Sequence, residues 1–190
     1  MTPYHDDISP ALKTLRSGGI ILYPTDTIWG IGCDATNPKA VQAVYRLKKR
    51  DESKSMLVLV DSVEMLEDYC RDVPEVAIQL SELSEKPCTL VLDGAEGLAP
   101  NLIASDGSVG MRVSRDPFSR DLIKAFGKPI VSTSANISGE PSPAVFNEIS
   151  EEVKTAVDYI VNWRRDDNAP ARPSSVIKIA PDGQFKIIRQ

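Results

Sequence analysis

Short apolar runs and amphipathic stretches alternate along the whole chain. Most of the apolar runs end at polar, glycine or proline residues, as buried strands commonly do. We predict strands at residues 20–23, 28–33, 56–60, 89–92, 109–113, 129–132, 159–161, 175–179 and 185–188. Because helical stretches lie between many of these strands, the pattern favours a layered α/β domain.

Apolar residues at helical spacing predict the helices. These are expected at residues 10–16, 38–48, 63–70, 75–84, 117–126 and, with weaker periodicity, 144–156. Asp7 or Ser9 is expected to cap the first helix. Asn37 followed by Pro38 is a typical start for the second helix, and Gly127 a typical end for the fifth.

The chain shows no internal repeat and no low-complexity linker. Its 190 residues are enough to bury one large core. We therefore expect a single domain over residues 1–190. The stretch 164–173 is rich in Arg, Asp, Asn and Pro, so it is predicted to be a mobile loop and a lid over the reaction site.

The composition is that of an ordinary globular protein, with 42% hydrophobic and 26% charged residues. No stretch approaches the about 20 uninterrupted apolar residues that a membrane span needs. The first residues carry acids in place of a basic region, so a secretory signal is not expected. A cytoplasmic protein without membrane contact is the expectation.

Histidine and cysteine content limits the possible chemistry. The single histidine, His5, lies in a terminal segment that is expected to fray. Cys33, Cys70 and Cys88 are far apart, form no C-x-x-C pair and are expected to be buried and reduced. A catalytic triad, a Cys–His nucleophile and a zinc site are therefore not expected. An enzyme built from this chain would rely on positioning, cations and hydroxyls.

The formal net charge of −5 argues against a broad basic face that coats a nucleic acid. Five basic residues nevertheless lie close together: Arg46, Lys48, Lys49, Arg50 and Lys54. A solvated helix end and a local contact with an anion or an RNA backbone are both open interpretations of this cluster.

Four polar clusters follow apolar strands or helix ends, at residues 24–30, 48–54, 110–112 and 132–136. In α/β proteins ligands usually bind in the crevice outside strand ends. Each cluster alone has a structural explanation, such as a turn, a cap or a buried pair of Arg112 with a carboxylate. The chain has neither a P-loop nor a dinucleotide-binding glycine fingerprint.

Taken together, these clusters match the pattern of one known family. P-T-[DE]-T-x-[YW]-G matches residues 24–30, K-x-R matches 48–50, V-x-x-R matches 109–112 and S-A-N-x-S-G matches 134–139. Lys54, Ser174 and Arg189 match three further positions. The chain thus resembles the YrdC-like family of L-threonylcarbamoyladenylate synthases. The resemblance implies a single-domain α/β fold, with a twisted mixed β-sheet flanked by helices.

Two departures from the family pattern affect expected threonine contacts. Trp29 stands where tyrosine is more common, and Leu59 stands where two-domain members often have histidine. Both could change affinity, but the cationic and hydroxyl positions remain.

The resemblance implies a nucleotidyltransferase. Such an enzyme converts L-threonine, bicarbonate or CO2, and ATP into threonylcarbamoyl-AMP and pyrophosphate for tRNA modification. A tRNA threonylcarbamoyl transferase would receive the product. Mg²⁺ is expected to arrive with ATP, because it prefers phosphates and waters to an all-protein cage. No residue is predicted to be a metal ligand.

The family pattern and side-chain chemistry assign roles to individual residues. Arginine offers phosphates and carboxylates a planar fork, and lysine offers a point charge. The predicted catalytic residues are Lys48, Arg50, Ser134 and Asn136; those for ATP are Arg50, Lys54, Ser108, Ser134, Ser142 and Arg189; and those for threonine are Thr27, Trp29, Arg112, Ser132 and Ser174.

Two alternatives remain at this point. One is a module of the same fold that binds double-stranded RNA or tRNA without synthase activity, although 6% aromatic content offers little for base stacking. The other is a paralogue that has lost the synthase activity. The intact K-x-R and S-x-N pairs favour the synthase over both.

Overall fold

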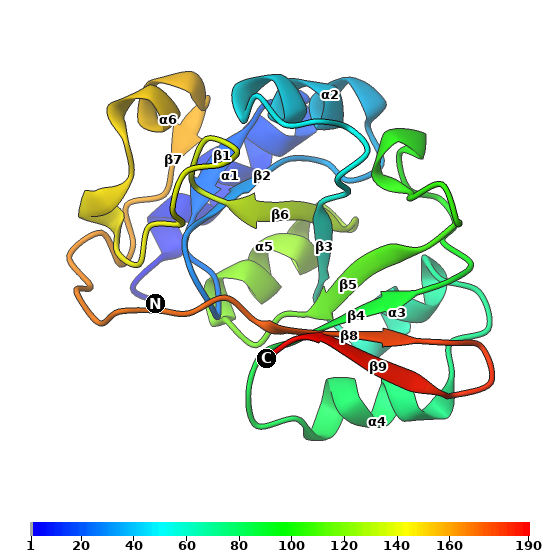
Figure 1. Ribbon diagram of the computed structural model, residues 1–190. Helices are drawn as coiled ribbons and strands as arrows, with labels where there is room; N and C mark the ends of the chain where they lie inside the picture. Colours follow the sequence, from blue (N-terminus) through cyan, green and yellow to red (C-terminus); the bar gives the residue numbers. More distant parts are fainter. Residues whose placement is uncertain (1) are drawn as a thin grey trace.

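A mixed β-sheet forms the centre of the computed structural model, which describes residues 2–190. The strands are β1 (Ile21–Tyr23), β2 (Gly30–Gly32), β3 (Leu57–Val60), β4 (Cys88–Leu92), β5 (Val109–Val113), β6 (Ile130–Ser134), β7 (Tyr159–Ile160), β8 (Ser175–Ile179) and β9 (Phe185–Arg189). Their order across the sheet is β7-β1-β2-β6-β3-β5-β4-β8-β9. The pairs β1·β7, β3·β5 and β4·β8 are parallel and the other five pairs are antiparallel. The sheet twists strongly from β1 to β9 (Figure 1).

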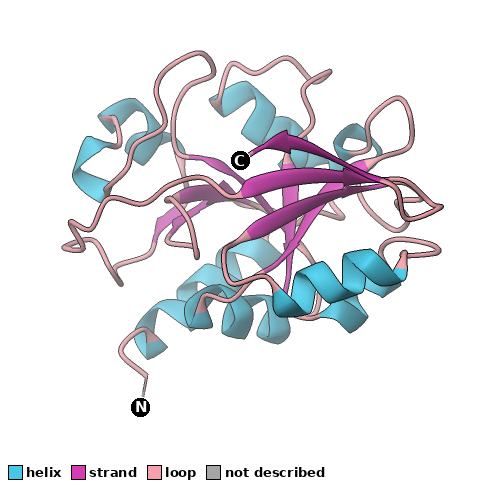
Figure 2. Cartoon of the chain, turned by 60° about the horizontal axis from the view of Figure 1, so that its bottom comes forward, coloured by secondary structure: helices cyan, strands magenta, loops and turns pink. Residues whose placement is uncertain are grey.

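Helices cover both faces of this sheet (Figures 1 and 2). They are α1 (His5–Arg16), α2 (Pro38–Leu47), α3 (Val63–Asp68), α4 (Glu75–Leu83), α5 (Pro117–Phe126) and α6 (Glu151–Ala156), with short 3-10 turns η1 (Pro100–Leu102) and η2 (Phe146–Glu148). None of the helices described between residues 2 and 190 is long and apolar enough to cross a membrane.

Alternate strand residues divide the buried side chains into two cores. Leu22, on one face of β1, belongs to the larger core with the apolar side of α2. Its neighbours Ile21 and Tyr23 belong to a second core with α1 and α5. Successive strand residues point to opposite faces, so the two cores lie on opposite sides of the sheet. This is the predicted layered α/β fold.

Local signals placed two helix ends correctly. The Asn37 side chain accepts hydrogen bonds from Lys39 N and Ala40 N at the start of α2. Gly127 ends α5 in the left-handed conformation, with φ of 74°. The helix predicted at 144–156 is shorter: η2 and then α6 occupy its place, with Ser150 as the α6 cap.

The predicted start of the first helix was wrong. α1 begins at His5, and neither Asp7 nor Ser9 caps it. The buried Asp7 carboxylate instead accepts hydrogen bonds from Tyr159 Oη at 2.6 Å and from Asn162 N and Trp163 N at 2.9 Å each. Tertiary partners more than 150 positions away therefore decide the role of this residue.

Candidate active site

A cavity of about 340 Å³ lies along one face of the twisted sheet. Residues of β2, β3, β4, β5, β6, β8 and β9 line it, so it runs across strand faces and is not confined to strand ends as we had expected. Most of the predicted site residues contribute to its wall: Thr27, Trp29, Arg50, Ser108, Arg112, Ser132, Ser134, Ser142, Ser174 and Arg189. Lys48, Lys54 and Asn136 are not part of this wall.

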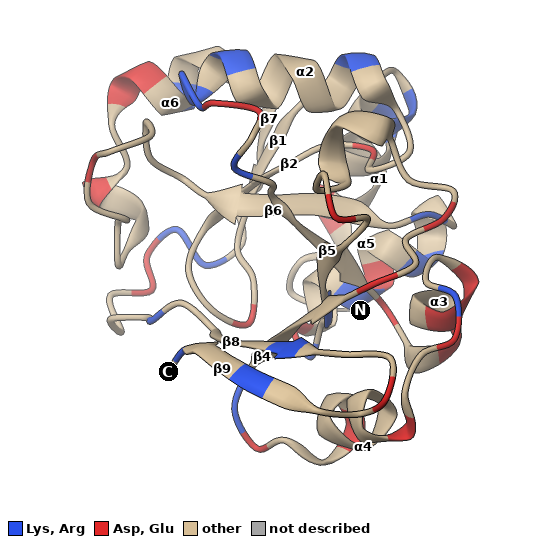
Figure 3. Cartoon of the chain, turned by 45° about the vertical axis from the view of Figure 1, so that its right-hand side comes forward, with Lys and Arg blue, Asp and Glu red and all other residues tan. Residues whose placement is uncertain are grey.

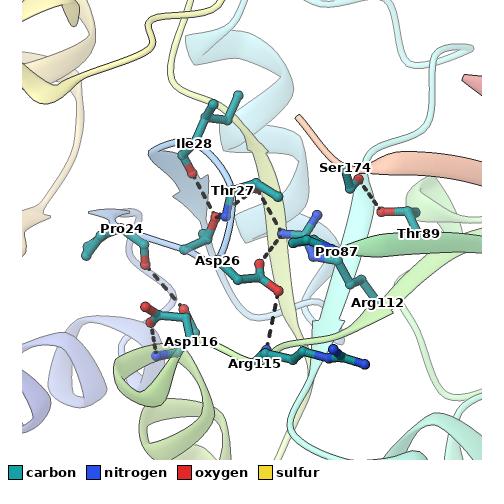
Figure 4. A network of polar contacts seen from close by, with 12 residues as sticks. Pro24, Asp26, Thr27, Ile28, Pro87, Thr89, Arg112, Arg115, Asp116 and Ser174 are labelled. Atoms are coloured by element: carbon teal, nitrogen blue, oxygen red, sulfur yellow. Dashed lines mark hydrogen bonds and ion pairs between the residues drawn. The ribbon is translucent and has the colours of Figure 1, made fainter. Parts of the chain in front are cut away.

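Arg112, the last but one residue of β5, is the most buried cation of the wall, with 3% of its surface exposed. Its Nη2 donates to Thr27 Oγ1 at 3.3 Å. The same nitrogen lies 3.0 Å from Asp26 Oδ1, which makes an ion pair without hydrogen-bond alignment. Arg112 Nε is buried and has no hydrogen-bond partner among residues 2–190. Arg112 thus pairs with a carboxylate and still has donor capacity beside the cavity (Figure 4).

The turn before β2 is fixed by its own hydroxyls. Thr25 Oγ1 donates to Ile28 O at 2.8 Å and accepts from Thr27 N at 3.0 Å. The two threonine hydroxyls are 3.0 Å apart. Since the Thr25 proton is used on Ile28 O, the Thr27 hydroxyl must be the donor of this pair. Thr27 Oγ1 accepts a hydrogen bond from Arg112 with one lone pair. Its second lone pair is free for a ligand donor.

Ser174, immediately before β8, is held from two sides. Its hydroxyl is 2.8 Å from Thr89 Oγ1 on β4. Its carbonyl accepts from Arg189 Nε at 3.1 Å and from Arg189 Nη2 at 2.8 Å. Thr89 also lines the cavity and was missed by our sequence analysis. A hydroxyl at a buried position of an apolar strand was a signal for it.

Trp29 forms an aromatic part of the wall. It is 6% exposed, and its ring lies 4.7 Å from that of Phe146, centroid to centroid. Leu59, the other departure from the family pattern, is fully buried in the second core and does not line the cavity.

Arg50 faces the cavity from the segment after α2. Its Nε donates to Lys54 O at 2.8 Å, and its Nη2 donates to Ser55 O at 3.1 Å. The guanidinium therefore shapes residues 51–55 as well as bringing charge to the cavity. Lys54 is exposed, and its carbonyl, not its ammonium, is the group that Arg50 binds.

Lys48 and Asn136 lie behind the wall. The Lys48 side chain is 1% exposed, and its ammonium donates to Ser134 O and, at 2.6 Å, to Asn136 O. Asn136 Nδ2 donates to Ile137 O at 3.0 Å and Glu140 O at 2.7 Å. The structure thus places both residues where they fix the backbone that follows β6. The catalytic role that we predicted for them stays a prediction.

Burial, and then the charge of nearby Arg50, lower the pKa of the Lys48 ammonium to about 8. The folded state therefore releases this proton at lower pH than the unfolded chain, whose lysine pKa is about 10.4. Between these values the unfolded chain binds more protons, so this group makes folding more favourable as pH rises. We expect the free energy of unfolding of the wild type to gain about 2 kcal/mol over that of Lys48→Met between pH 8 and pH 10. Urea titrations of both proteins measure this difference, and a constant difference would contradict the buried charge.

No cluster of three or more His, Cys, Asp or Glu side chains that could hold a metal ion occurs among the described residues 2–190. The carboxylates near the cavity are already engaged: Asp26 pairs with Arg112, and Asp116 pairs with Arg164.

Comparisons with known proteins identify relatives of this chain. A model of the Sua5, YciO and YrdC proteins, described as "Telomere recombination", matches residues 13–190. A threonylcarbamoyl-AMP synthase of Stenotrophomonas maltophilia is 34% identical over 170 residues, which are 87% of this chain and 91% of that protein.

Two solved structures extend the comparison. P. abyssi Sua5 complexed with L-threonine aligns with a TM-score of 0.84 and 27% identity, over 96% of this chain and 53% of that one. Full-length HypF in its phosphate- and nucleotide-bound form aligns with a TM-score of 0.82 and 29% identity, over 96% of this chain and 28% of that one. Because the family model covers residues 13–190 and the named relative is 34% identical over most of its length, the chain belongs to the Sua5/YciO/YrdC family.

Proposed function

We propose that this chain is a threonylcarbamoyl-AMP synthase, a nucleotidyltransferase that makes threonylcarbamoyl-AMP for tRNA modification. The observation that carries the proposal is Arg112. It is a buried cation whose Nε has no partner among residues 2–190 and whose Nη2 binds the Thr27 hydroxyl, and it lies in the wall of a cavity large enough for small substrates. The relatives with this name, and the L-threonine complex of P. abyssi Sua5, support it.

The Arg112 side of the cavity suits an amino acid. The guanidinium would bind the threonine carboxylate, as a bidentate or charge-assisted pair. The free lone pair of Thr27 Oγ1 and the hydroxyls of Ser132 and Ser174 would satisfy the substrate amine and hydroxyl. Trp29 would form an apolar wall for the methyl group. A pocket built to satisfy a hydroxyl rejects an isostere that lacks it, because its own polar groups are then left unpaired.

The remaining polar wall residues would serve ATP. Arg50 and Arg189 supply positive charge, and Ser108, Ser134 and Ser142 supply hydroxyls for phosphate or ribose oxygens. Lys54 is exposed and close to this side, and would reach the outer phosphates by side-chain rotation. The nucleotide-bound form of the related HypF supports a nucleotide in this fold.

The chemistry needs no side-chain nucleophile. The threonine amine would add to CO2 and lose a proton, or condense with bicarbonate and lose water, to give an N-carboxylate. An oxygen of this carboxylate would attack the α-phosphorus, and the bond to pyrophosphate would break. The protein's task is to hold two anionic groups together and to stabilise charge on the phosphates. Mg²⁺ would enter as its complex with ATP, held by phosphates and water.

Pyrophosphate release tests the proposal. Release should require L-threonine, bicarbonate and ATP together, and mass spectrometry should identify threonylcarbamoyl-AMP. The alternative, an RNA-binding module, predicts no release and binding of double-stranded RNA that weakens steeply with salt. Basic and acidic segments are interspersed over the molecule (Figure 3), and this favours the synthase. The downstream tRNA-modifying protein and direct tRNA contact stay predictions.

A further inference from the structure

One arginine connects the loop after β7 to the turn before β2. Arg164 Nη1 donates to Thr25 O at 3.0 Å and lies 3.2 Å from Asp116 Oδ1. Its Nε donates to Asp167 Oδ2 at 3.3 Å, within the same loop. The contacts to Thr25 and Asp116 span 139 and 48 positions of sequence. Arg164 does not line the cavity, but it lines a second, small pocket that shares Thr27 and Trp29 with it.

The backbone at Arg164 is in an uncommon conformation. Its φ is 66°, in the left-handed region that costs a residue with a Cβ about 1 kcal/mol or more. Such a conformation persists where the surrounding contacts fix it. Here the contacts of the Arg164 side chain with Thr25, Asp116 and Asp167 fix it, and they direct the guanidinium toward the turn before β2.

Asp116 gives the guanidinium a buried counter-charge. The carboxylate is 5% exposed, and its Oδ2 caps α5 by accepting from Ser119 N at 2.8 Å. Burial raises the pKa of Asp116, and the charge of Arg164 opposes this shift. Removing Arg164 would leave Asp116 with its capping bond but without its cation. The arginine is therefore held at a fixed point, between a helix start and the turn.

The turn contact leads directly to the threonine side of the cavity. The carbonyl of Thr25 accepts a hydrogen bond from Arg164. The hydroxyl of Thr25 accepts one from the Thr27 backbone amide and one from the Thr27 hydroxyl. Thr27 Oγ1 in turn accepts from Arg112. Thr25 alone thus lies between Arg164 and Thr27, and Arg112 is one contact further, through Thr27.

The loop reaches the same side of the cavity at its other end. Residues 162–174 carry no helix or strand, and we call them the 162–174 loop. At its start, Asn162 and Trp163 donate to the Asp7 carboxylate. At its end, Pro173 and Ser174 line the cavity. The lid motion predicted for this segment stays a prediction, and these contacts define which part of it is held in place.

We propose that Arg164 is a positioning residue, which ties the 162–174 loop to the turn 24–28 and thereby sets Thr27 and Arg112 for the amino-acid substrate. This inference rests on the proposed synthase function. It assigns to Arg164 an effect on threonine and not on ATP, because Arg50 and its neighbours contact neither Thr25 nor Asp116.

The matched control is the next residue along the chain. Arg165→Ala removes the same charge as Arg164→Ala. The Arg165 guanidinium, however, donates to Val161 O and Ile160 O and lies over the Phe146 ring. We expect Arg164→Ala to raise the threonine KM about tenfold and the ATP KM less than about twofold. Arg165→Ala should change both constants less than about twofold. Arg164→Lys, which can reach one of the two partners, should recover part of the threonine KM.

A double-mutant cycle distinguishes a positioning role of Arg164 from a general loss of stability. Thr25→Val removes the hydroxyl link to Thr27, so Arg164→Ala should have a smaller effect on threonine KM in that background than in the wild type. Equal effects in both backgrounds, equal shifts of the threonine and ATP constants, or identical results for Arg164→Ala and Arg165→Ala would each overturn the proposal.

A measurement without catalysis keeps the two proposals distinguishable. If the wild type releases no threonine-dependent pyrophosphate, the synthase function fails. The positioning role is then tested by hydrogen exchange of the Thr27 amide, which donates to Thr25 Oγ1. This amide should exchange faster in Arg164→Ala than in Arg165→Ala. Equal rates would overturn the link between Arg164 and the turn.

Discussion

Replacing Arg112 with alanine is expected to lower kcat/KM for threonine about a hundredfold, and for serine to a similar extent. Every candidate amino acid carries the same carboxylate, so loss of its cation should not discriminate among them. Pyrophosphate release at matched concentrations of threonine, serine and valine measures the effect. Arg115→Ala is the matched control, because its exposed guanidinium binds Ser81 O and Glu82 O instead of the cavity.

Arg112→Ala also leaves Asp26 buried without its cation, and such a loss can cost several kcal/mol of stability. The double variant Asp26→Asn/Arg112→Ala removes that buried charge. If the double variant folds with a normal midpoint and still lacks threonine-dependent activity, the loss belongs to substrate binding. Recovery of full activity in the double variant would contradict a carboxylate-binding role for Arg112.

The hydroxyls around Arg112 should set the choice between threonine and valine. The wild type should use threonine well and valine poorly. Serine should fall between them, because it lacks only a methyl group worth about 1 kcal/mol of burial. Equal rates for threonine and valine would show that the pocket does not recognise the hydroxyl, and the threonine assignment would then fail.

Arg50→Ala should reduce ATP-dependent turnover about thirtyfold, through loss of one charge-assisted contact of about 2 kcal/mol. Its effect includes the loosening of residues 51–55, because Arg50 binds the carbonyls of Lys54 and Ser55. Lys49→Ala is the control: it removes the same charge one position earlier, but Lys49 is exposed and pairs with Glu152 at 2.8 Å. Turnover should be unchanged in Lys49→Ala, and wild-type turnover in Arg50→Ala would rule out a phosphate contact.

Sequence-local signals predicted the fold well. Apolar periodicity located all nine strands of the described residues, within a few positions, and the cap at Asn37 and the stop at Gly127 are confirmed. The start of α1 could not be predicted in this way, because the partners of Asp7 lie at residues 159–163. An aspartate whose carboxylate binds the backbone of a distant loop stands in the same local sequence pattern as one that caps a helix.

The candidate site was predictable as a set of residues but not as an arrangement. The family motifs and side-chain chemistry together identified ten residues that the fold brings to one cavity. They could not show that the Lys48 ammonium points away from it, toward the backbone after β6. Nor could they place Thr89 opposite Ser174, a contact made by the parallel pairing of β4 and β8. Motifs specify residue types, whereas sheet register decides which side chains meet.

The position of β9 has a consequence for how this protein would lose activity on heating. β9 is the outermost strand, paired only with β8, and Phe185, Ile187 and Ile188 on it are largely exposed. Strands of this kind open locally at lower free energy than the centre of a sheet. Arg189 lies on β9 and holds the carbonyl of Ser174. Fraying of this one edge would remove part of the cavity wall while both hydrophobic cores stay intact. We therefore expect activity to be lost on heating before the fold melts.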